Sequence, residues 1–317
     1  MTRLGRSDLD VFPLCLGGNV FGWTADERQS FAVLDAYVQA GGNFVDSSDS
    51  YSAFAPGNVG GESEAILGKW LAARGNRASV VIATKVGRKP DRKGLSQANI
   101  RVAVQESLER LQTDYIDLYY AHADDPDTPL EETLATFDEL IRDGKVRYIA
   151  ASNYSAPRLE QALETSDRNG LARYVALQPH YSLIERDHYE GSLEDLCQRE
   201  GLSCVPYWAL ARGFLTGKYR PGTTVDSPRA GQASAYLDDR GIRVLEALDL
   251  VAEAHATTVA AVALAWVRAQ PTVAAPLASA RNTQQLAQIL PAAALELSPG
   301  EVGDLSDAAA QSPASAS

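Results

Sequence analysis

The sequence predicts an α/β fold in which eight parallel strands alternate with helices and close into a (β/α)8 (TIM) barrel, as two observations indicate. Short apolar or β-branched runs alternate with amphipathic segments, and several runs are continuously apolar, as expected for strands covered on both faces. A chain of 317 residues has the length of one such barrel, although it could also hold two domains. The predicted strands are residues 15–17, 43–46, 80–85, 115–122, 148–152, 174–178, 203–207 and 272–277.

The start of the chain precedes this alternation and predicts a β-hairpin. Residues 1–4 and 11–14 flank the polar turn sequence GRSD (5–8). We expect this hairpin to cap the bottom of the barrel, which is the end at which the strands begin.

Apolar residues in the segments between the strands recur with the 3.6-residue period of a helix. We predict helix N-termini capped by Thr24 and Thr128, each followed three residues later by a glutamate. Gly41 and Gly42 should end the first helix, because glycine adopts the left-handed conformation there without strain. The clearest apolar stripes are Phe31, Leu34 and Val38; Ile100, Val104, Leu108 and Leu111; and Leu130, Leu134, Phe137 and Ile141.

The main structural alternative is a doubly wound open sheet, which needs a G-x-G-x-x-G turn after its first strand. Residues 16–22 read LGGNVFG and lack that spacing, which favours the barrel. Two long connections, residues 86–97 and 211–239, are rich in glycine, proline and charge, and should lie at the C-terminal rim of a barrel. No repeat or linker divides the chain, so we expect one domain over residues 1–307 and a disordered tail over 308–317.

The charge balance argues against nucleic acids and membranes as partners. The 29 lysines and arginines are outnumbered by 41 aspartates and glutamates, which gives a net charge of −12. A chain this acidic is poorly suited to hold nucleic-acid phosphates or an anionic membrane surface. No uncharged apolar stretch reaches the roughly 18 residues that a membrane-spanning helix needs.

Cysteine and histidine usage argues against a disulfide scaffold and a metal centre. The three cysteines, Cys15, Cys197 and Cys204, form no C-x-x-C pair and suit a reducing compartment. The four histidines lack H-E-x-x-H spacing, and the first residues contain no apolar signal segment. Together these features predict a cytoplasmic protein without a bound metal.

Polar side chains follow the ends of successive predicted strands, where a barrel gathers its functional groups at one mouth. Asp46 ends the second strand and Tyr51 lies in the loop after it, while Lys85 ends the third strand and His122 the fourth. Each residue alone has an ordinary explanation as a cap, a packed ring or a solvated strand end, but their convergence favours a shared site. The fifth and sixth strands end in Ser152, Asn153 and Gln178.

This set of groups suits carbonyl–alcohol redox chemistry. A tyrosine hydroxyl has a pKa of about 10, and a neighbouring ammonium group lowers it by stabilising the phenolate. We expect Lys85 to act on Tyr51 in this way, with Asp46 holding the lysine charged and oriented. Tyr51 would give a proton to a carbonyl oxygen, or remove one in reverse, while His122 donates a hydrogen bond to that oxygen and a cofactor supplies hydride.

The chain resembles the aldo-keto reductases from the N-terminal hairpin to about residue 290. The resemblance rests on the order and spacing of seven segments, each of which would be weak alone. These are NFVDSSDSY (43–51), VVIATKVG (80–87), YIDLYYAHADDP (115–126), YIAASNYS (148–155), ALQPHYSLIER (176–186), PYWALARGFLTGKY (206–219) and PLASARNTQQL (276–286).

The resemblance implies an NADP(H)-dependent reductase of a small carbonyl compound, such as an aldehyde, a ketone or a keto-sugar. The family's four catalytic residues fall on Tyr51 as general acid/base, Asp46 and Lys85 as the pair that tunes it, and His122 as the group that orients the carbonyl. The cofactor would lie extended at the barrel mouth without a separate dinucleotide-binding domain, with the ring of Tyr207 stacked on the nicotinamide.

Further cofactor contacts follow from the same segments. Residues 210–213 and Lys218 would cover the pyrophosphate, while Ser279 and Arg281 match the pocket for the adenosine 2′-phosphate, which favours NADPH over NADH. Ile289 stands where asparagine is common in the family and removes one hydrogen bond to adenine. The implied cofactor-binding residues are Gly18, Asn19, Asp46, Ser152, Asn153, Gln178, Tyr207, Trp208, Ala209, Leu210, Ala211, Arg212, Gly213, Lys218, Ser279, Arg281, Gln285 and Gln288.

For the substrate we expect contacts with Trp23 and Phe54, besides Tyr51 and His122. Both aromatic residues lie in loops that should reach the mouth, and they suit an apolar or sugar-ring carbonyl compound. The physiological substrate and the choice between a monomer and a homo-oligomer stay open.

Two other functions also stay open. The family includes potassium-channel β subunits that use bound NADPH to regulate a partner, but those subunits carry asparagine at the position of His122. An unrelated hydrolase barrel could use Asp46 with Asp49 or Glu62 as paired carboxylates, although this leaves Lys85 without a role.

Overall fold

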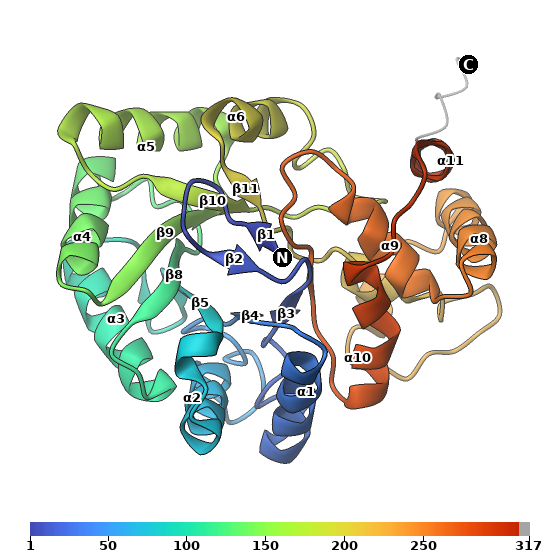
Figure 1. Cartoon of the computed structure of the whole chain (residues 1–317), viewed down its shortest axis with the longest axis horizontal. Coiled ribbons are helices and arrows are strands. Elements are labelled where there is room, and N and C mark those ends of the chain that lie inside the picture. Colours follow the sequence, from blue (N-terminus) through green and yellow to red (C-terminus); the bar gives the residue numbers. More distant parts are fainter. Residues whose placement is uncertain (311–317) are drawn as a thin grey trace.

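The computed structural model describes residues 1–310, in which eight parallel strands form one curled sheet ringed by helices, as a (β/α)8 barrel requires (Figure 1). The strands are β3 (Cys15–Gly17), β4 (Phe44–Asp46), β5 (Val81–Val86), β8 (Ile116–Ala121), β9 (Val146–Ser152), β10 (Tyr174–Gln178), β11 (Ser203–Cys204) and β12 (Leu277–Ala278). Their order in the sheet is β11-β10-β9-β8-β5-β4-β3-β12, and every neighbouring pair is parallel.

The sheet closes between β11 and β12. β12 pairs with β3 on one side, and just before β12 the Ala274 N–H donates to Cys204 O at 2.9 Å on the other. We predicted a continuous eighth strand over 272–277, but only Leu277–Ala278 forms a strand. The earlier residues pair through an isolated bridge, because Pro276 has no N–H to continue the ladder.

The predicted N-terminal hairpin is present and lies across the ring of strands (Figure 1). It consists of β1 (Thr2–Arg3) and β2 (Asp10–Val11), which pair antiparallel. Leu4, Leu9 and Val11 are buried in one apolar cluster with residues at the starts of the barrel strands, such as Phe44 and Val81. The hairpin therefore closes the bottom of the barrel and leaves the opposite end for the site.

The helices pack around the sheet, and a second, larger apolar cluster fills the space between the two layers. They are α1 (Glu27–Gln39), α2 (Glu62–Arg74), α3 (Gln97–Leu111), α4 (Leu130–Arg142), α5 (Ala156–Asn169), α6 (Ser192–Glu200), α7 (Ala230–Ser234), α8 (Asp239–Ala254), α9 (Val259–Arg268), α10 (Thr283–Ile289) and α11 (Pro299–Ala309), with short 3-10 turns η1 (Arg77–Ser79), η2 (Ala211–Thr216) and η3 (Leu290–Ala293).

Two predicted helix caps are wrong. Asp26, not Thr24, caps α1, because its carboxylate accepts from the backbone N–H three residues on at 2.7 Å. Pro129 precedes α4, and the hydroxyl of Thr128 donates instead to Asp125 Oδ2 at 2.7 Å. The predicted end of the first helix is confirmed, since α1 stops just before the glycine pair.

The buried helix faces follow the predicted stripe on α3 but shift on α1. Leu34 is buried as predicted, whereas Phe31 and Val38 are only partly buried. Val33 and Tyr37 face the core in their place, and the Tyr37 hydroxyl donates to a backbone carbonyl at 2.6 Å. A hydrogen-bonded tyrosine is thus part of a stripe that a purely apolar pattern could not show.

Helix α11 extends past the expected domain boundary. We placed that boundary after Asp307, but α11 continues to Ala309, which is buried. The rest of the predicted tail, residues 311–317, lies outside the described residues.

The two long connections predicted at the rim contain short structural elements. The first connection holds the hairpin β6 (Arg88–Lys89) and β7 (Arg92–Lys93), and the second holds η2 and α7.

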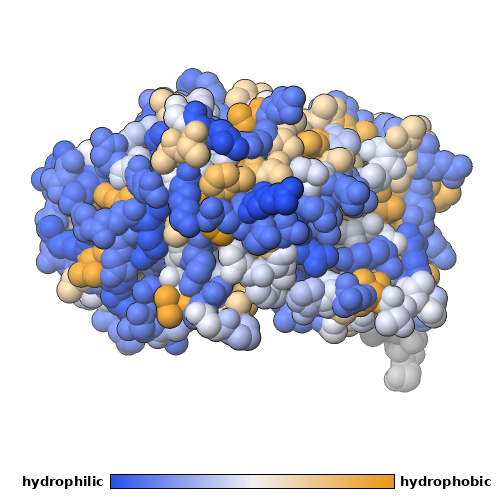
Figure 2. Space-filling view, turned by 90° about the horizontal axis from the view of Figure 1, so that it is seen from below, coloured by the Kyte–Doolittle hydropathy of each residue, from blue (hydrophilic) through white to orange (hydrophobic). Residues whose placement is uncertain are grey.

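Figure 2 shows one side of the molecule, on which hydrophilic residues predominate and smaller groups of apolar residues lie between them. Within residues 1–310, no single helix is long and apolar enough to cross a membrane, and α8 and α9 pass that test only together, across a 97° bend. Cys15, Cys197 and Cys204 are free and buried.

Candidate active site

β4 and β5 end side by side in a buried ion pair. Asp46 is the last residue of β4, and Lys85 lies one residue before the end of β5, so the parallel register brings both side chains to the same end of the barrel. Lys85 Nζ lies 2.6 Å from each carboxylate oxygen of Asp46 and donates to Ser47 O at 2.7 Å. Both side chains are fully buried. Each charge needs the other, because an unpaired buried charge costs several kcal/mol.

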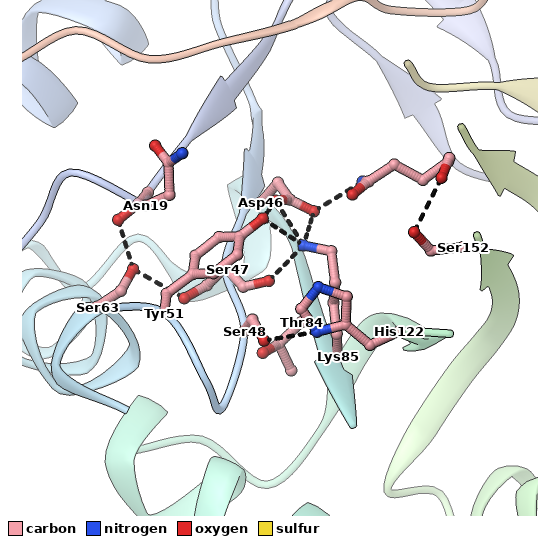
Figure 3. Close-up of polar contacts among 12 residues, drawn as sticks. Asn19, Asp46, Ser47, Ser48, Tyr51, Ser63, Thr84, Lys85, His122 and Ser152 are labelled. Atoms are coloured by element: carbon pink, nitrogen blue, oxygen red, sulfur yellow. Dashed lines mark hydrogen bonds and ion pairs between the residues drawn. The ribbon is translucent and has the colours of Figure 1, made fainter. Parts of the chain in front are cut away.

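Tyr51 joins this pair from the loop between β4 and α2. Its Oη donates to Asp46 Oδ2 at 2.7 Å and accepts from Lys85 Nζ at 2.8 Å (Figure 3). The ammonium group also lies 4.5 Å from the centre of the Tyr51 ring. The phenol, the amine and the carboxylate that the sequence places at two strand ends and a loop are therefore in direct contact.

The pKa of Tyr51 is raised well above its ordinary value of 10, because the phenolate would be buried and would lie beside the Asp46 carboxylate. We predicted the opposite direction from the charge of Lys85. That prediction was wrong, because Asp46 contacts both groups and offsets the ammonium charge. Burial also lowers the pKa of Lys85, and Asp46 opposes this shift. Tyr51 therefore keeps its proton at neutral pH, which is the state that can protonate a carbonyl oxygen.

His122 follows β8 directly, and its ring lies edge-on to that of Tyr51, with 6.2 Å between the ring centres. Ser48 Oγ lies 3.2 Å from His122 Nδ1 (Figure 3). Burial, followed by the charges of Lys85 and Arg88, holds the pKa of His122 well below 6.5. The imidazole is therefore neutral at physiological pH and has one N–H to donate.

The ends of β9 and β10 add amide groups to the same site. Gln178 Nε2 donates to Asp46 Oδ1 at 3.0 Å, and Ser152 Oγ donates to Gln178 O at 2.8 Å. Asn153 Nδ2 donates to His122 O at 2.8 Å. These side chains reach the wall of the cavity described below, where their donors and acceptors suit a carboxamide.

Tyr207 is the cavity-lining member of an aromatic stack. Its ring stacks on His180 with 5.6 Å between ring centres, and His180 stacks on His188 at 4.9 Å. Trp208 packs edge-on against Tyr207 at 5.1 Å, and the Tyr207 hydroxyl donates to Asn153 Oδ1 at 2.7 Å. These contacts fix the ring plane of Tyr207. Sequence reasoning missed the two histidines, because nothing in their spacing indicates that they stack.

A cavity of about 640 Å³ opens at the C-terminal ends of the strands. Most of the residues that were predicted from the sequence to contact the cofactor or the substrate line this cavity. The predicted residues that line it are Asn19, Trp23, Tyr51, Phe54, His122, Ser152, Asn153, Gln178, Tyr207, Trp208, Ala209, Leu210, Arg212, Gly213, Lys218, Ser279, Arg281, Gln285 and Gln288.

Four predicted site residues do not line the cavity. Asp46 and Lys85 lie beneath its floor and contact the lining residues Tyr51 and, in the case of Asp46, Gln178. The Gly18 N–H donates to Asp46 O at 2.8 Å, and Ala211 is fully buried. The cofactor contacts expected of Gly18 and Ala211 stay predictions, and neither residue is among those that line the cavity.

The end of the cavity near β12 is basic. Ser279 Oγ donates to Asn19 Oδ1 at 2.6 Å, and the backbone N–H of Arg281 donates to Gln285 Oε1 at 3.0 Å. No hydrogen bond or ion pair within residues 1–310 engages the guanidinium of Arg281. Burial, and then the charge of Arg281, lowers the pKa of Lys218. The two cations thus share one region that would attract phosphate.

Both predicted rim connections contribute to the cavity, and each supplies a cation that sequence reasoning missed. Arg88 and Pro90 line it from the first connection, and Arg229 lines it from the second. The Arg229 guanidinium lies 5.3 Å from the Trp23 ring centre, and Trp23 packs edge-on against Phe54 at 4.8 Å. The only available signal was the place of both arginines in rim connections.

The carboxylate pair of the hydrolase alternative is not formed. Asp46 is held by Lys85, and Asp49 does not line the cavity. Glu62 accepts instead from the backbone N–H groups of Val59 and Gly60, at 2.7 and 3.0 Å. Within residues 1–310, no group of three or more histidine, cysteine or acidic side chains could hold a metal ion.

A model of the aldo/keto reductase family matches residues 13–310. The chain belongs to the aldo/keto reductase family. Protein tas of Escherichia coli (strain K12) is 34% identical to it over 93% of each chain. Norsolorinic acid reductase of Aspergillus flavus is 32% identical over 94% of this chain and 78% of its own. A probable voltage-gated potassium channel subunit beta of Oryza sativa subsp. japonica is 32% identical over 98% of this chain and 96% of its own.

Aldo/keto reductases are oxidoreductases that act on small carbonyl compounds with a nicotinamide cofactor, usually NADP(H), and this chain is such an enzyme. The residues present fit that cofactor. One end of the cavity offers cations that form no ion pair within residues 1–310 and could hold phosphate groups, and the other offers amide and hydroxyl groups beside the ring of Tyr207.

Proposed function

We propose that the protein reduces an aldehyde, ketone or keto-sugar to an alcohol with NADPH, and that Tyr51 is the general acid/base. The observation that carries this proposal is the hydrogen-bonded set of Tyr51, Lys85 and Asp46 beneath a cavity that His122 also lines. When bound, the cofactor supplies hydride to the carbonyl carbon.

The residues of the chain handle the proton and the developing charge. The neutral His122 imidazole and the Tyr51 hydroxyl hold the carbonyl oxygen from two sides. As negative charge grows on that oxygen, Tyr51 transfers its proton to it. Lys85 donates to the Tyr51 oxygen at 2.8 Å and stabilises the phenolate that is left, while Asp46 keeps the lysine in place.

The cofactor would lie along the cavity, with its phosphates at Arg212, Lys218 and Arg281 and its nicotinamide against Tyr207. The amide groups of Asn153 and Gln178 would meet the carboxamide. A preference for NADPH over NADH follows from the guanidinium of Arg281, because its planar set of N–H groups can form two parallel hydrogen bonds with the 2′-phosphate that only NADPH carries.

The decisive experiment replaces Tyr51 by phenylalanine. Tyr51→Phe should lower kcat with activated aldehydes or diketones by about a hundredfold or more, because the proton donor is lost. Binding of NADPH, followed by fluorescence titration, should be retained. Tyr119→Phe is the matched control, since the Tyr119 hydroxyl is buried, has no hydrogen-bond partner within residues 1–310 and does not line the cavity. Undiminished turnover in Tyr51→Phe would refute the assignment.

A non-enzymatic redox sensor is the second candidate, and the similarity to the rice channel subunit favours it. It predicts NADPH binding without turnover of any carbonyl compound in a broad screen. His122 supports the reductase instead, because the channel subunits of the family carry asparagine at this position, whereas here an imidazole lines the cavity beside Tyr51.

A further inference from the structure

The cavity carries a surplus of positive charge that the protein as a whole does not have. The chain has a net charge of −12, yet among residues 1–310 no aspartate or glutamate lines this cavity. Because all the charged side chains in its lining are cations, the cavity attracts anions although the protein as a whole is acidic. The cationic residues that line it are Arg88, Arg212, Lys218, Arg229 and Arg281.

Three of these cations, Arg212, Lys218 and Arg281, are the ones proposed above to hold the cofactor phosphates. Arg229 lies 5.3 Å from the centre of the Trp23 ring. Burial lowers the pKa of Arg229, the nearby Tyr51 raises it, and the charges of Arg212 and Arg281 lower it. Arg229 therefore lies between these three cations and the reacting groups.

Arg88 lies beside the reacting groups instead. It is the first residue of β6 and follows closely on the strand that carries Lys85. It lies two residues after Val86, whose carbonyl oxygen accepts from the His122 backbone N–H at 2.9 Å, and it lines the same cavity as His122 and Tyr207. Asp46 neutralises Lys85 and the imidazole is uncharged, so the positive charge on this side comes from Arg88 and from Arg229, whose guanidinium packs on the Trp23 ring.

No hydrogen bond or ion pair within residues 1–310 engages the Arg88 side chain, although its neighbours in the hairpin are paired. Lys89 contacts Asp91 at 3.2 Å, and Arg92 contacts Glu106 at 2.6 Å. A guanidinium presents five N–H donors in a fixed plane and matches a carboxylate with two parallel hydrogen bonds. Arg88 is thus a free anion-binding group in the cavity wall.

We propose that Arg88 binds a carboxylate on the substrate, so that the preferred substrates are carbonyl compounds that also carry a carboxylate. This rests on the proposed function, in which Tyr51 and His122 hold the carbonyl oxygen. The carboxylate would fix the far end of the molecule while the carbonyl lies at the floor of the cavity. Trp23 and Phe54 would then cover the apolar part between them.

The test compares aldehydes that differ only in charge. 3- and 4-carboxybenzaldehyde are each paired with their neutral methyl ester, and kcat/KM is measured at saturating NADPH. For whichever of the two carboxybenzaldehydes is the better substrate, kcat/KM of the wild-type protein should exceed that for the methyl ester by about tenfold or more. Arg88→Ala should remove this preference while leaving turnover of the ester within about twofold, Arg88→Lys should keep part of it, and Arg88→Glu should reverse it.

Lys93→Ala is the matched control, because Lys93 pairs with Arg88 in the register of the hairpin, carries the same charge and does not line the cavity. It should leave the preference intact. Equal turnover of acid and ester by the wild-type protein would overturn the carboxylate site, and so would an equal loss on both substrates in Arg88→Ala. Both results leave the reductase proposal standing. If NADPH binds but neither aldehyde is reduced, the reductase proposal fails, and the carboxylate site fails with it.

Discussion

Ser48 Oγ lies 3.2 Å from His122 Nδ1, while no hydrogen bond within residues 1–310 engages Nε2 of the same ring. The Ser48 hydroxyl is fully buried, and Ser50 Oγ lies further from the same nitrogen, at 3.5 Å. The hydrogen bond at one ring nitrogen sets the orientation of the ring and decides which nitrogen faces the cavity. Ser48 is thus a positioning residue for His122.

Removing this hydroxyl should misplace the imidazole without disturbing the cofactor. We expect Ser48→Ala to lower kcat by about tenfold, which corresponds to the loss of one hydrogen bond, with the Kd for NADPH unchanged. Ser52→Ala is the control, because its hydroxyl is equally buried but donates to Phe21 O at 2.9 Å. If both variants lose activity equally, the loop as a whole matters and the contact with His122 does not.

The ion pair beneath the cavity should be needed for stability as well as for turnover. Asp46→Asn leaves the Lys85 charge buried without its partner, so the free energy of unfolding should fall by about 3–5 kcal/mol. Urea denaturation measures this change. The double variant Asp46→Leu/Lys85→Met should regain most of the stability, since no charge is left buried, yet it should stay inactive. Recovery of turnover in the double variant would contradict the role given to the pair.

The cofactor preference provides a third prediction. Arg281→Ala should raise the Kd for NADPH about tenfold or more and leave the Kd for NADH nearly unchanged, because only NADPH carries the 2′-phosphate. Arg220→Ala serves as the control, since Arg220 pairs with Asp249 at 2.7 Å and does not line the cavity. Equal weakening of both cofactors would place Arg281 near another part of the dinucleotide.

Asp49 should make stability depend on pH. Burial and the nearby Glu64 raise the pKa of Asp49 from 3.8 to about 7. Because the folded pKa lies above the unfolded one, the folded protein holds a proton that the unfolded chain releases between about pH 4 and 7. Stability therefore falls as the pH rises through this window and changes no further above it.

Replacing the carboxyl by an amide removes this effect. Asp49→Asn should stabilise the protein at pH 8 by a free energy on the order of 4 kcal/mol and change it little at pH 4. Denaturation at the two pH values measures the difference. A loss of stability that is the same at both would show that the contact between Ser48 Oγ and Asp49 Oδ1, 3.3 Å long, matters more than the titration.

Much of the site could be predicted because it lies where strands end. The positions of Asp46 and Lys85 in two apolar runs fix their side chains at one end of adjacent parallel strands, and the register then brings them together. The direction of the Tyr51 pKa could not be predicted, since it depends on burial and on the contact with Asp46, neither of which is encoded locally.

The parts that were missed depend on contacts between distant segments. Arg88 and Arg229 enter the cavity because two long connections fold over its mouth, and no periodic pattern marks this. The cap at Asp26 was missed because Thr24 offers the same local signal two residues earlier. The eighth strand was overextended because its apolar residues hide the effect of Pro276.

The burial of all three cysteines has a consequence for an enzyme that handles electrophiles. Reactive aldehydes and enones alkylate thiolates, and a thiol is open to this attack only where it is exposed and ionised. Cys15, Cys197 and Cys204 are shielded from solvent, and burial raises the pKa of each thiol, that of Cys197 to about 12. The protein should therefore withstand inactivation at its sulfur atoms by the class of compounds that it converts.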